Sequence, residues 1–317
     1  MTNVRTTLTL FEGDVVSHQA DVSGAGLQSV GLHRNTQVYA IQGASGRWGC
    51  SSTTLAGDAR SYAECETLDD PVDTSVPINL LAWLGQSNAR GADPTYTYTP
   101  AAGTDGRRHF FDLAGAWGDF DVEPLHKLPA IDSIQTGQAD GGFSAALRTV
   151  ELLCASRTTE HWAALGAAVS GSALSTWAQS TSRGTNYGHA WARIRQALRR
   201  PNVVLRGIVW YQGESDTGDE TLANTYATRA QTLFDAWRSD LAMPDLPIFV
   251  IRIRSDHPGT YVSTVRAQQA HLAQASPPQI VIDAPEGAGT LFDSTHLNVT
   301  GQNALADLLV PAIEGTL

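Results

Sequence analysis

Cysteine is scarce in this chain of 317 residues, and its three copies form neither a disulfide framework nor a metal-binding pattern. Cys50, Cys65 and Cys154 include no Cys-x-x-Cys pair, which excludes the usual cysteine-based zinc sites. A bridge between Cys50 and Cys65 stays open for an oxidising compartment, because the sequence does not show their geometry. Free thiols are the simpler expectation for an odd and small number of cysteines.

Basic charge and long apolar runs are also lacking. The 32 acidic residues outnumber the 21 lysines and arginines, and the net charge of −11 argues against a nucleic-acid partner, because phosphates bind basic surfaces. No apolar run approaches the about 20 residues of a membrane-spanning helix. The opening stretch MTNVRTTLTLFEGDVV has no secretory signal pattern, so we expect no removable leader. The location stays open between the cytoplasm, export by another route, and a virion.

Residues 1–76 differ in composition from the rest of the chain. They are rich in Gly, Ser and Thr, and short β-type runs such as RTTLTLF and TQVYAIQ alternate with turn clusters. The pattern predicts a small β-rich domain or arm that ends in the linker LDDPVDTSVP. Two roles stay open for it: a cap that supports the rest of the protein, or an attachment to a larger assembly such as a phage tail.

Residues 77–317 alternate apolar runs with helical periodicity. The apolar runs predict five strands, at residues 78–84, 161–169, 202–210, 247–253 and 279–284. Apolar residues at three- and four-residue spacing predict helices at 142–155, 187–200, 219–242, 262–275 and 300–314. Strands divided by helices indicate an α/β fold with three layers, in which helices cover both faces of a parallel five-stranded sheet. The segment 91–107 is expected to be a surface loop.

Ser87 follows the first predicted strand, in the stretch LLAWLGQSNARG. Ligands of open parallel sheets bind beyond the carboxyl ends of the strands, so a serine at this point is a candidate nucleophile. Gln86 and Asn88 flank it and are candidates for substrate contact or for support of the site. A serine after a strand is more often an ordinary turn residue, so Ser87 alone is a weak signal.

Partners for such a serine follow later strands of the predicted sheet. Asp293 and His296 stand three residues apart after the last strand, where the imidazole is suited to take the serine proton and the carboxylate to orient the ring. Gly171 follows the second strand, and the N–H groups of Ser87 and Gly171 are candidates to bind a substrate oxyanion. Together these signals, in order at one sheet edge, favour catalysis over the ordinary alternative that His296 only packs or caps.

Several sequence blocks then resemble a known superfamily. GQSNARG at 85–91 and WYQGESD at 210–216 are similar to signature blocks of the SGNH hydrolases, in particular the branch of sialate O-acetylesterase-like carbohydrate esterases. The resemblance continues through VSGSALSTW at 169–177 and DSTHLNVTGQNALAD at 293–307, and leaves residues 1–76 outside. It implies a flavodoxin-like α/β/α fold and a triad of Ser87, His296 and Asp293. It also implies that the Ser87 and Gly171 amides form an oxyanion hole.

The third block departs from the superfamily pattern Gly-x-Asn-Asp, whose Asn donates to the oxyanion. Here the block reads Gly213-Glu214-Ser215-Asp216, so another donor is needed. Gln212 is our candidate, because its amide NH₂ donates whereas an ionised Glu214 does not. Glu214 and Trp177 are further candidates for substrate contact or support of the site, although Trp177 is more simply explained as core or cleft wall.

These observations favour a serine esterase that removes acetyl or another short acyl group from a carbohydrate, without metal or other cofactor. Activity is expected to rise with pH as His296 loses its proton. A lipase or thioesterase of the same superfamily remains an alternative, disfavoured by the polar segments 91–107 and 178–188. The other alternative is a carbohydrate-binding protein of a surface-attacking assembly in which esterase activity is accessory.

Overall fold

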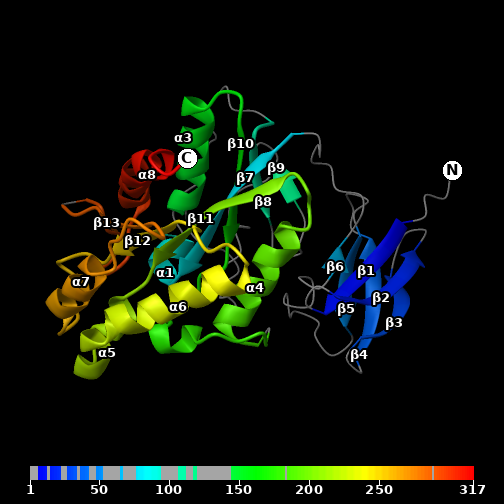
Figure 1. The fold of residues 1–317 in the computed structure, drawn as a ribbon, viewed down its shortest axis with the longest axis horizontal. Helices are drawn as coiled ribbons and strands as arrows, with labels where there is room; N and C mark the ends of the chain where they lie inside the picture. The colour runs from blue at the N-terminus through cyan, green and yellow to red at the C-terminus, as the bar shows by residue number, and fades with distance from the viewer. Residues whose placement is uncertain are drawn as a thin grey trace.

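The computed structural model describes residues 76–93, 106–111, 144–182, 184–287 and 289–317 in full, and elsewhere only the backbone of short strands. Seven strands form one sheet in the spatial order β13-β12-β11-β7-β10-β8-β9 (Figure 1). Their bounds are β7 Ile78–Gly85, β8 Arg108–Phe111, β9 Trp117–Asp119, β10 His161–Gly166, β11 Val203–Tyr211, β12 Ile248–Arg252 and β13 Gln279–Asp283. All of the strands from β13 to β8 run parallel, and β9 pairs antiparallel with β8.

The predicted parallel α/β sheet is confirmed, but its strand number is corrected from five to six parallel strands. The missed strand is β8, whose sequence RHFF is short and begins with a charged residue. The side chain of Arg108 is nevertheless fully buried, because its Nη1 donates to Glu151 Oε1 at 3.0 Å. A hydropathy pattern therefore misses this strand, because it reads Arg108 as exposed although the ion pair with Glu151 allows it to be buried. Most of the expected loop 91–107 lies outside the described residues.

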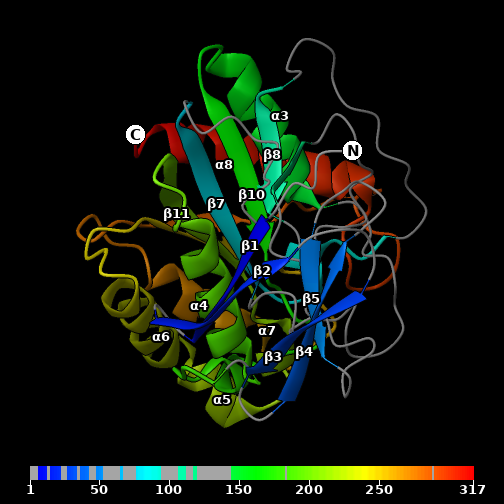
Figure 2. The same cartoon turned by 90° about the vertical axis from the view of Figure 1, so that its right-hand side faces the viewer.

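Helices cover both faces of this sheet. On one face lie α3 (Ala145–Ser156) and α8 (Val299–Glu314), which contact each other, and on the other lie α4 (Asn186–Ala197) and α6 (Tyr226–Asp240), as Figures 1 and 2 show. Two shorter helices, α5 (Glu220–Asn224) and α7 (Val262–Ala270), contact each other and α6. The single helix expected over 219–242 is therefore two helices that meet at Thr225.

The core lies between these layers. Every residue of β7 is buried, as expected for a central strand that is covered on both faces. Five tryptophans are fully buried around the sheet, at positions 83, 162, 177, 210 and 237. This packing holds the carboxyl ends of the central strands, after which the chain continues into polar residues.

Six further strands lie in residues 1–76. Thr6–Glu12 (β1), Val15–Val22 (β2) and Cys65–Glu66 (β6) form one antiparallel sheet, and Leu27–His33 (β3), Thr36–Gln42 (β4) and Trp48–Ser52 (β5) form another. The expected β content is present, while the domain boundary and the role of this region stay predictions. The side chains of Cys50 and Cys65 lie outside the described ones, and Cys154 is a buried thiol that forms no disulfide among the described residues.

Candidate active site

Ser87 begins a four-residue helix, α1 (Ser87–Arg90), directly beyond the end of β7. The turn into this helix depends on Gly85, which has a φ of +125° and whose absent Cβ would lie 2.1 Å from the carbonyl oxygen of Tyr211 in β11. Only glycine permits this close approach together with a positive φ. The N–H of Gln86 then donates to the same carbonyl at 2.9 Å, so the chain enters α1 held against β11.

A cavity of about 800 Å³ opens at this point. Residues that follow several strands of the sheet line it: Gln86, Ser87, Arg90, Ala92, Ser170, Gly171, Glu214, Ser215, His257, Phe292, Asp293, Thr295 and His296. The carboxyl ends of the parallel strands thus contribute to one common site, as expected for an open α/β sheet.

The structure brings Ser87, His296 and Asp293 together in a continuous chain of hydrogen bonds. Ser87 Oγ lies 2.9 Å from His296 Nε2, and His296 Nδ1 lies 2.7 Å from Asp293 Oδ2. When Nδ1 carries the ring proton and donates it to Asp293, Nε2 is free to accept the proton of the serine hydroxyl. This geometry is suited to general-base activation of Ser87.

The other oxygen of Asp293 holds the backbone of the same loop. Asp293 Oδ1 accepts the N–H groups of Thr295 and His296, each at 2.7 Å. Partial burial acts to raise the pKa of Asp293, but the hydrogen bonds from the His296 ring and from these two backbone groups outweigh it and lower the pKa. The carboxylate therefore stays ionised at neutral pH beside the imidazole.

Asn88 joins this loop to the serine. Its Oδ1 accepts the N–H of Leu297 at 2.9 Å, and its Nδ2 donates to the carbonyl of Thr295 at 3.2 Å and to Glu214 Oε1 at 2.7 Å. Asn88 is 1% exposed and lies behind Ser87. Of its two expected roles, the contacts favour support of the site over substrate contact.

Gly171 reaches the cavity on a loop that continues the pairing of β10 with β7. The N–H groups of Ala167 and Val169 donate to the carbonyls of Trp83 and Gly85, each at 2.9 Å, and Gly171 itself turns with a φ of +64°. Among the residues that the structure describes, the N–H groups of Ser87 and Gly171 have no protein acceptor. Both groups are thus available to a ligand in the cavity.

Gln212 and Trp177 do not line the cavity, so the expectation that Gln212 donates directly to the oxyanion does not agree with its position. Gln212 is fully buried and does not line the cavity, because its Nε2 is engaged by Asp216 Oδ2 at 2.7 Å and by the carbonyl of Ser172 at 3.1 Å. Trp177 is also fully buried, donates from Nε1 to Ser172 Oγ at 2.9 Å and packs edge-on against Trp210. Neither side chain is placed to contact a substrate in this cavity, and of the two roles expected for Trp177 its bond to Ser172 favours support of the site.

Glu214 lines the cavity as a largely buried carboxyl group. Burial raises its pKa, and this effect exceeds the opposing ones from the Asn88 hydrogen bond, a backbone hydrogen bond and His296, while Asp216 adds to it. Its Oε1 accepts from Asn88, whereas Oε2 has no partner within the described part of the chain. The environment therefore favours the protonated form more than water does.

Sequence reasoning missed His257 and Phe292. His257 follows β12, a strand end that carried no recognisable motif, and its Nδ1 accepts the N–H of Gly259 at 3.1 Å. Burial lowers the pKa of His257; Asp256 opposes this effect and His296 adds to it. Because Nδ1 accepts the N–H of Gly259, the neutral ring carries its proton on Nε2. Phe292 stacks on His296 with ring centroids 5.6 Å apart. Its position next to Asp293 was the signal that would have found it.

The described residues contain neither a metal-binding cluster nor a membrane-spanning helix. Within that part of the chain, no three His, Cys, Asp or Glu side chains are grouped so that they could hold a metal ion. No helix in it is long and apolar enough to cross a bilayer. The expectation that no cofactor is needed stays a prediction.

Comparisons with known proteins agree with the resemblance. A family model described as carbohydrate esterase, sialic acid-specific acetylesterase, matches residues 77–314. A curated protein of Arabidopsis thaliana, named probable carbohydrate esterase At4g34215, is 30% identical over 142 residues, which are 45% of this chain and 51% of that protein. The aligned part therefore spans about half the length of this relative.

Solved structures share the fold. The structure of the Arabidopsis thaliana protein AT4G34215 matches with a TM-score of 0.63 and 23% identity, over 75% of this chain and 98% of the other. The structure of NanS matches with a TM-score of 0.56 and 16% identity, over 75% and 97% of the two chains. At these identities the likeness concerns the arrangement of helices and strands alone.

Proposed function

Because the chain belongs to the carbohydrate esterase family of sialic acid-specific acetylesterases, we propose that it is a serine esterase that removes acetyl or other short acyl groups from the hydroxyls of a carbohydrate. One observation carries the proposal: Ser87, His296 and Asp293 form an unbroken hydrogen-bonded chain at a cavity. Membership of this family supports a carbohydrate ester as the substrate that such a site would take.

In the first half of the proposed reaction, Ser87 Oγ attacks the ester carbonyl carbon while its proton passes to His296 Nε2. Asp293 stabilises the resulting imidazolium, and the N–H groups of Ser87 and Gly171 bind the oxyanion of the tetrahedral intermediate. The intermediate collapses by breaking the bond to the sugar oxygen, which takes the proton from His296. The products are a free sugar hydroxyl and an acetylated Ser87.

In the second half, water repeats the attack. His296 removes a proton from the water as the oxygen bonds to the acetyl carbon, and the second intermediate releases acetate as Ser87 regains its proton. His296 accepts the proton only in its neutral form. The lowered pKa of Asp293 keeps that carboxylate charged beside the ring at neutral pH.

The test combines substrate preference with removal of the nucleophile. We would measure release of 4-nitrophenol from acetate, butyrate and octanoate esters, and release of acetate from O-acetylated sialic acid and acetylated xylo-oligosaccharides. Wild-type protein is expected to prefer acetate esters, and Ser87→Ala to lower kcat by a factor on the order of 10⁴ to 10⁶. Ser156→Ala, which changes an exposed serine bonded to Glu314, is the matched control.

Two outcomes would contradict the proposal. Full activity of Ser87→Ala would show that Ser87 is not the nucleophile. A preference for octanoate over acetate esters would favour the lipase or thioesterase alternative. Residues 1–76 lie outside the family match, so attachment to a larger assembly remains a separate proposal. Deleting them tests it: loss of association with retained esterase activity would support an attachment role.

A further inference from the structure

An oxyanion in this cavity has two backbone donors on hand, and the side chain first expected to supply a third is turned away. Gln212 lies behind the cavity wall with its NH₂ group engaged by Asp216 and Ser172. One carboxamide does line the cavity beside Ser87, and that is Gln86. Its orientation decides whether it offers the cavity a donor or an acceptor.

The partners of Gln86 fix the orientation of its amide. Gln86 Oε1 receives the N–H of Ser215 at 3.3 Å and the NH₂ of Gln212 at 3.4 Å. Both partners are donors, so the oxygen of Gln86 must face them, and a flipped amide would oppose donor to donor. The NH₂ group of Gln86 finds no acceptor among the described residues and is not one of their fully enclosed, unpaired polar atoms. It is therefore available on the cavity side.

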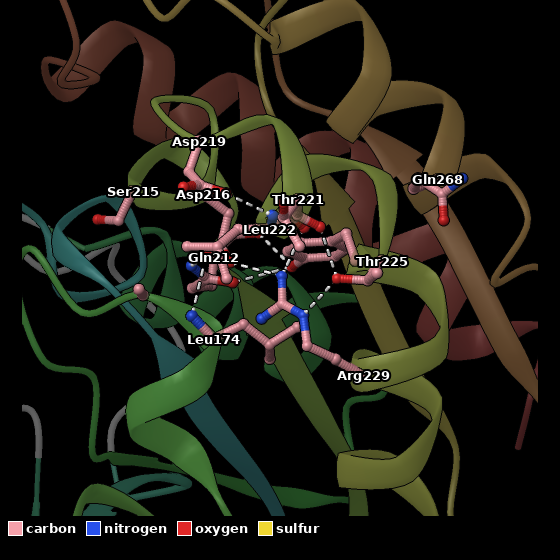
Figure 3. A network of polar contacts seen from close by, with 12 residues as sticks. Leu174, Gln212, Ser215, Asp216, Asp219, Thr221, Leu222, Thr225, Arg229 and Gln268 are labelled. Carbon is pink, nitrogen blue, oxygen red and sulfur yellow. Dashed lines mark hydrogen bonds and ion pairs between the residues drawn. The ribbon is translucent and has the colours of Figure 1, made fainter.

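Gln212 is itself held firmly. Its Nε2 donates to Asp216 Oδ2, and a carboxylate oxygen can only accept, so the orientation of the Gln212 amide is also fixed. Asp216 is fully buried and is bound from the other side by Arg229 Nη2 at 2.8 Å. Figure 3 shows Gln212, Asp216 and Arg229 converging in this network.

The same network holds the loop that carries Gly171. Asp216 Oδ2 also accepts the N–H of Leu174 at 2.9 Å (Figure 3). Gln212 Nε2 reaches the carbonyl of Ser172 at 3.1 Å. One buried carboxylate thus holds both Gln212 and the loop that carries Gly171. Donors that are fixed before the substrate arrives are those that stabilise an oxyanion best.

We propose that the side-chain amide of Gln86 is the third oxyanion donor. This inference rests on the proposed esterase function. In the tetrahedral intermediate, Gln86 Nε2 donates one N–H to the oxygen that was the ester carbonyl, beside the N–H groups of Ser87 and Gly171. No proton is transferred, and the bond strengthens as negative charge develops on that oxygen.

Two substitutions remove the donor in different ways. Gln86→Glu keeps the shape and an acceptor for Ser215 and Gln212 but replaces the NH₂ group by an oxygen, and Gln86→Met removes both polar groups without adding charge. Both are expected to lower kcat for 4-nitrophenyl acetate by about 10²-fold or more, with KM changed by less than about 3-fold. Gln179→Glu and Gln179→Met, at a surface amide bonded to Asp240, are the matched controls and should keep wild-type kcat.

A second readout separates a donor from a merely structural residue. Methylboronic acid forms a tetrahedral adduct with a reactive serine, so its inhibition constant should rise in the Gln86 variants by a factor close to the loss in kcat. Thermal unfolding followed by circular dichroism shows whether each Gln86 variant is folded. If one of the two does not fold, the result is taken from the other.

Each remaining outcome is decisive. Wild-type kcat in a folded Gln86 variant would overturn the inference, and so would a change confined to KM or a loss of kcat with unchanged boronate inhibition. Ser87→Ala is measured beside them. An inactive wild type or an active Ser87→Ala would instead overturn the proposed function, whereas active Gln86 variants beside an inactive Ser87→Ala would overturn the inference alone.

Discussion

The two sides of the cavity are built differently. The serine side (residues 85–91, 170–174 and 212–216) follows buried strands, and its Gln86 and Ser87 are only 3% and 5% exposed, while Gly171 on its loop is exposed. On the base loop (residues 292–297), the side chains of His296 and Asp293 are 27% and 41% exposed. Oxyanion binding needs fixed dipoles shielded from water, whereas proton transfer needs one ring held in reach of the serine. The fold supplies the first from its core and the second from a loop.

Different forces hold the two sides. The serine side depends on close backbone packing and on a buried network around Asp216. The base loop is organised by its own local hydrogen bonds to Asp293, and Asn88 fastens it to the serine side. Substitutions at the close backbone contacts or in the buried network of the serine side should therefore lower stability, whereas those on the base loop should lower activity alone.

The largest effect is expected from Gly85→Ala. The added methyl group would lie 2.1 Å from the backbone oxygen of Tyr211, at a φ of +125°. Backbone atoms of a central strand do not move aside easily, so we expect the free energy of unfolding to fall by at least about 4 kcal/mol. Urea unfolding measures the loss. Gly218→Ala is the control, because its Cβ would meet nothing within 4 Å, and equal stability of the two variants would contradict the prediction.

Asp293→Asn should act on activity and not on the fold. The amide oxygen can still accept the N–H groups of Thr295 and His296, but the NH₂ group would face His296 Nδ1 and favour the wrong tautomer. We expect kcat to fall by a factor on the order of 10⁴ with nearly unchanged urea unfolding. The exposed Asp245→Asn serves as control. A loss below tenfold would show that the carboxylate does not orient the ring.

Asn88→Ala should affect both sides. It removes the acceptor of the Leu297 N–H and the donor to Glu214, and an orphaned buried N–H costs about 1–3 kcal/mol. Misplacement of the base loop should lower kcat by a factor on the order of 10². Asn186→Ala, which removes an exposed amide bonded to Thr176, is the control. Urea unfolding curves and initial rates are measured for both variants. A kcat of Asn88→Ala that is no lower than that of Asn186→Ala would contradict the prediction.

The smallest effect concerns Glu214 and appears only as a function of pH. Burial raises its pKa, so its contribution to stability is complete below its ordinary pKa and is lost as the pH rises through the raised one. Glu214→Gln stays neutral, and the difference in thermal midpoint between variant and wild type should become more positive as the pH increases. A difference that is constant or falls with pH would contradict the raised pKa.

Glu286→Gln provides a control of opposite sign. Hydrogen bonding from the backbone of Ser255 lowers the pKa of Glu286, so its carboxylate stabilises the fold above its ordinary pKa, and this contribution is lost as the pH falls through the lowered one. The midpoint difference for Glu286→Gln should therefore become more negative with rising pH. Parallel trends in the two variants would indicate a general effect of pH.

Much of the fold was predictable because apolar periodicity reports burial. All five predicted strands correspond to observed ones, and α3, α4, α7 and α8 lie where the helical pattern expected them. The pattern failed where polar groups are buried in pairs, as with Arg108 and Glu151 in β8. It also failed at Thr225, where one apolar stripe continues across a break between two helices.

The sequence by itself determined that Ser87, Gly171 and the pair Asp293 and His296 follow strand ends, and the parallel topology then requires that they share one edge. Only the tertiary structure decided which neighbouring side chains face the cavity. Gln86 and Gln212 both follow strands and carry the same amide. The N–H of Ser215 binds the oxygen of Gln86, whose NH₂ group then faces the cavity, whereas Asp216 binds the NH₂ group of Gln212 inside the protein. Apart from Asp216, which follows Gln212 by only four residues, these hydrogen-bond partners lie about 40 to 130 positions away along the chain, so no local pattern encodes the choice.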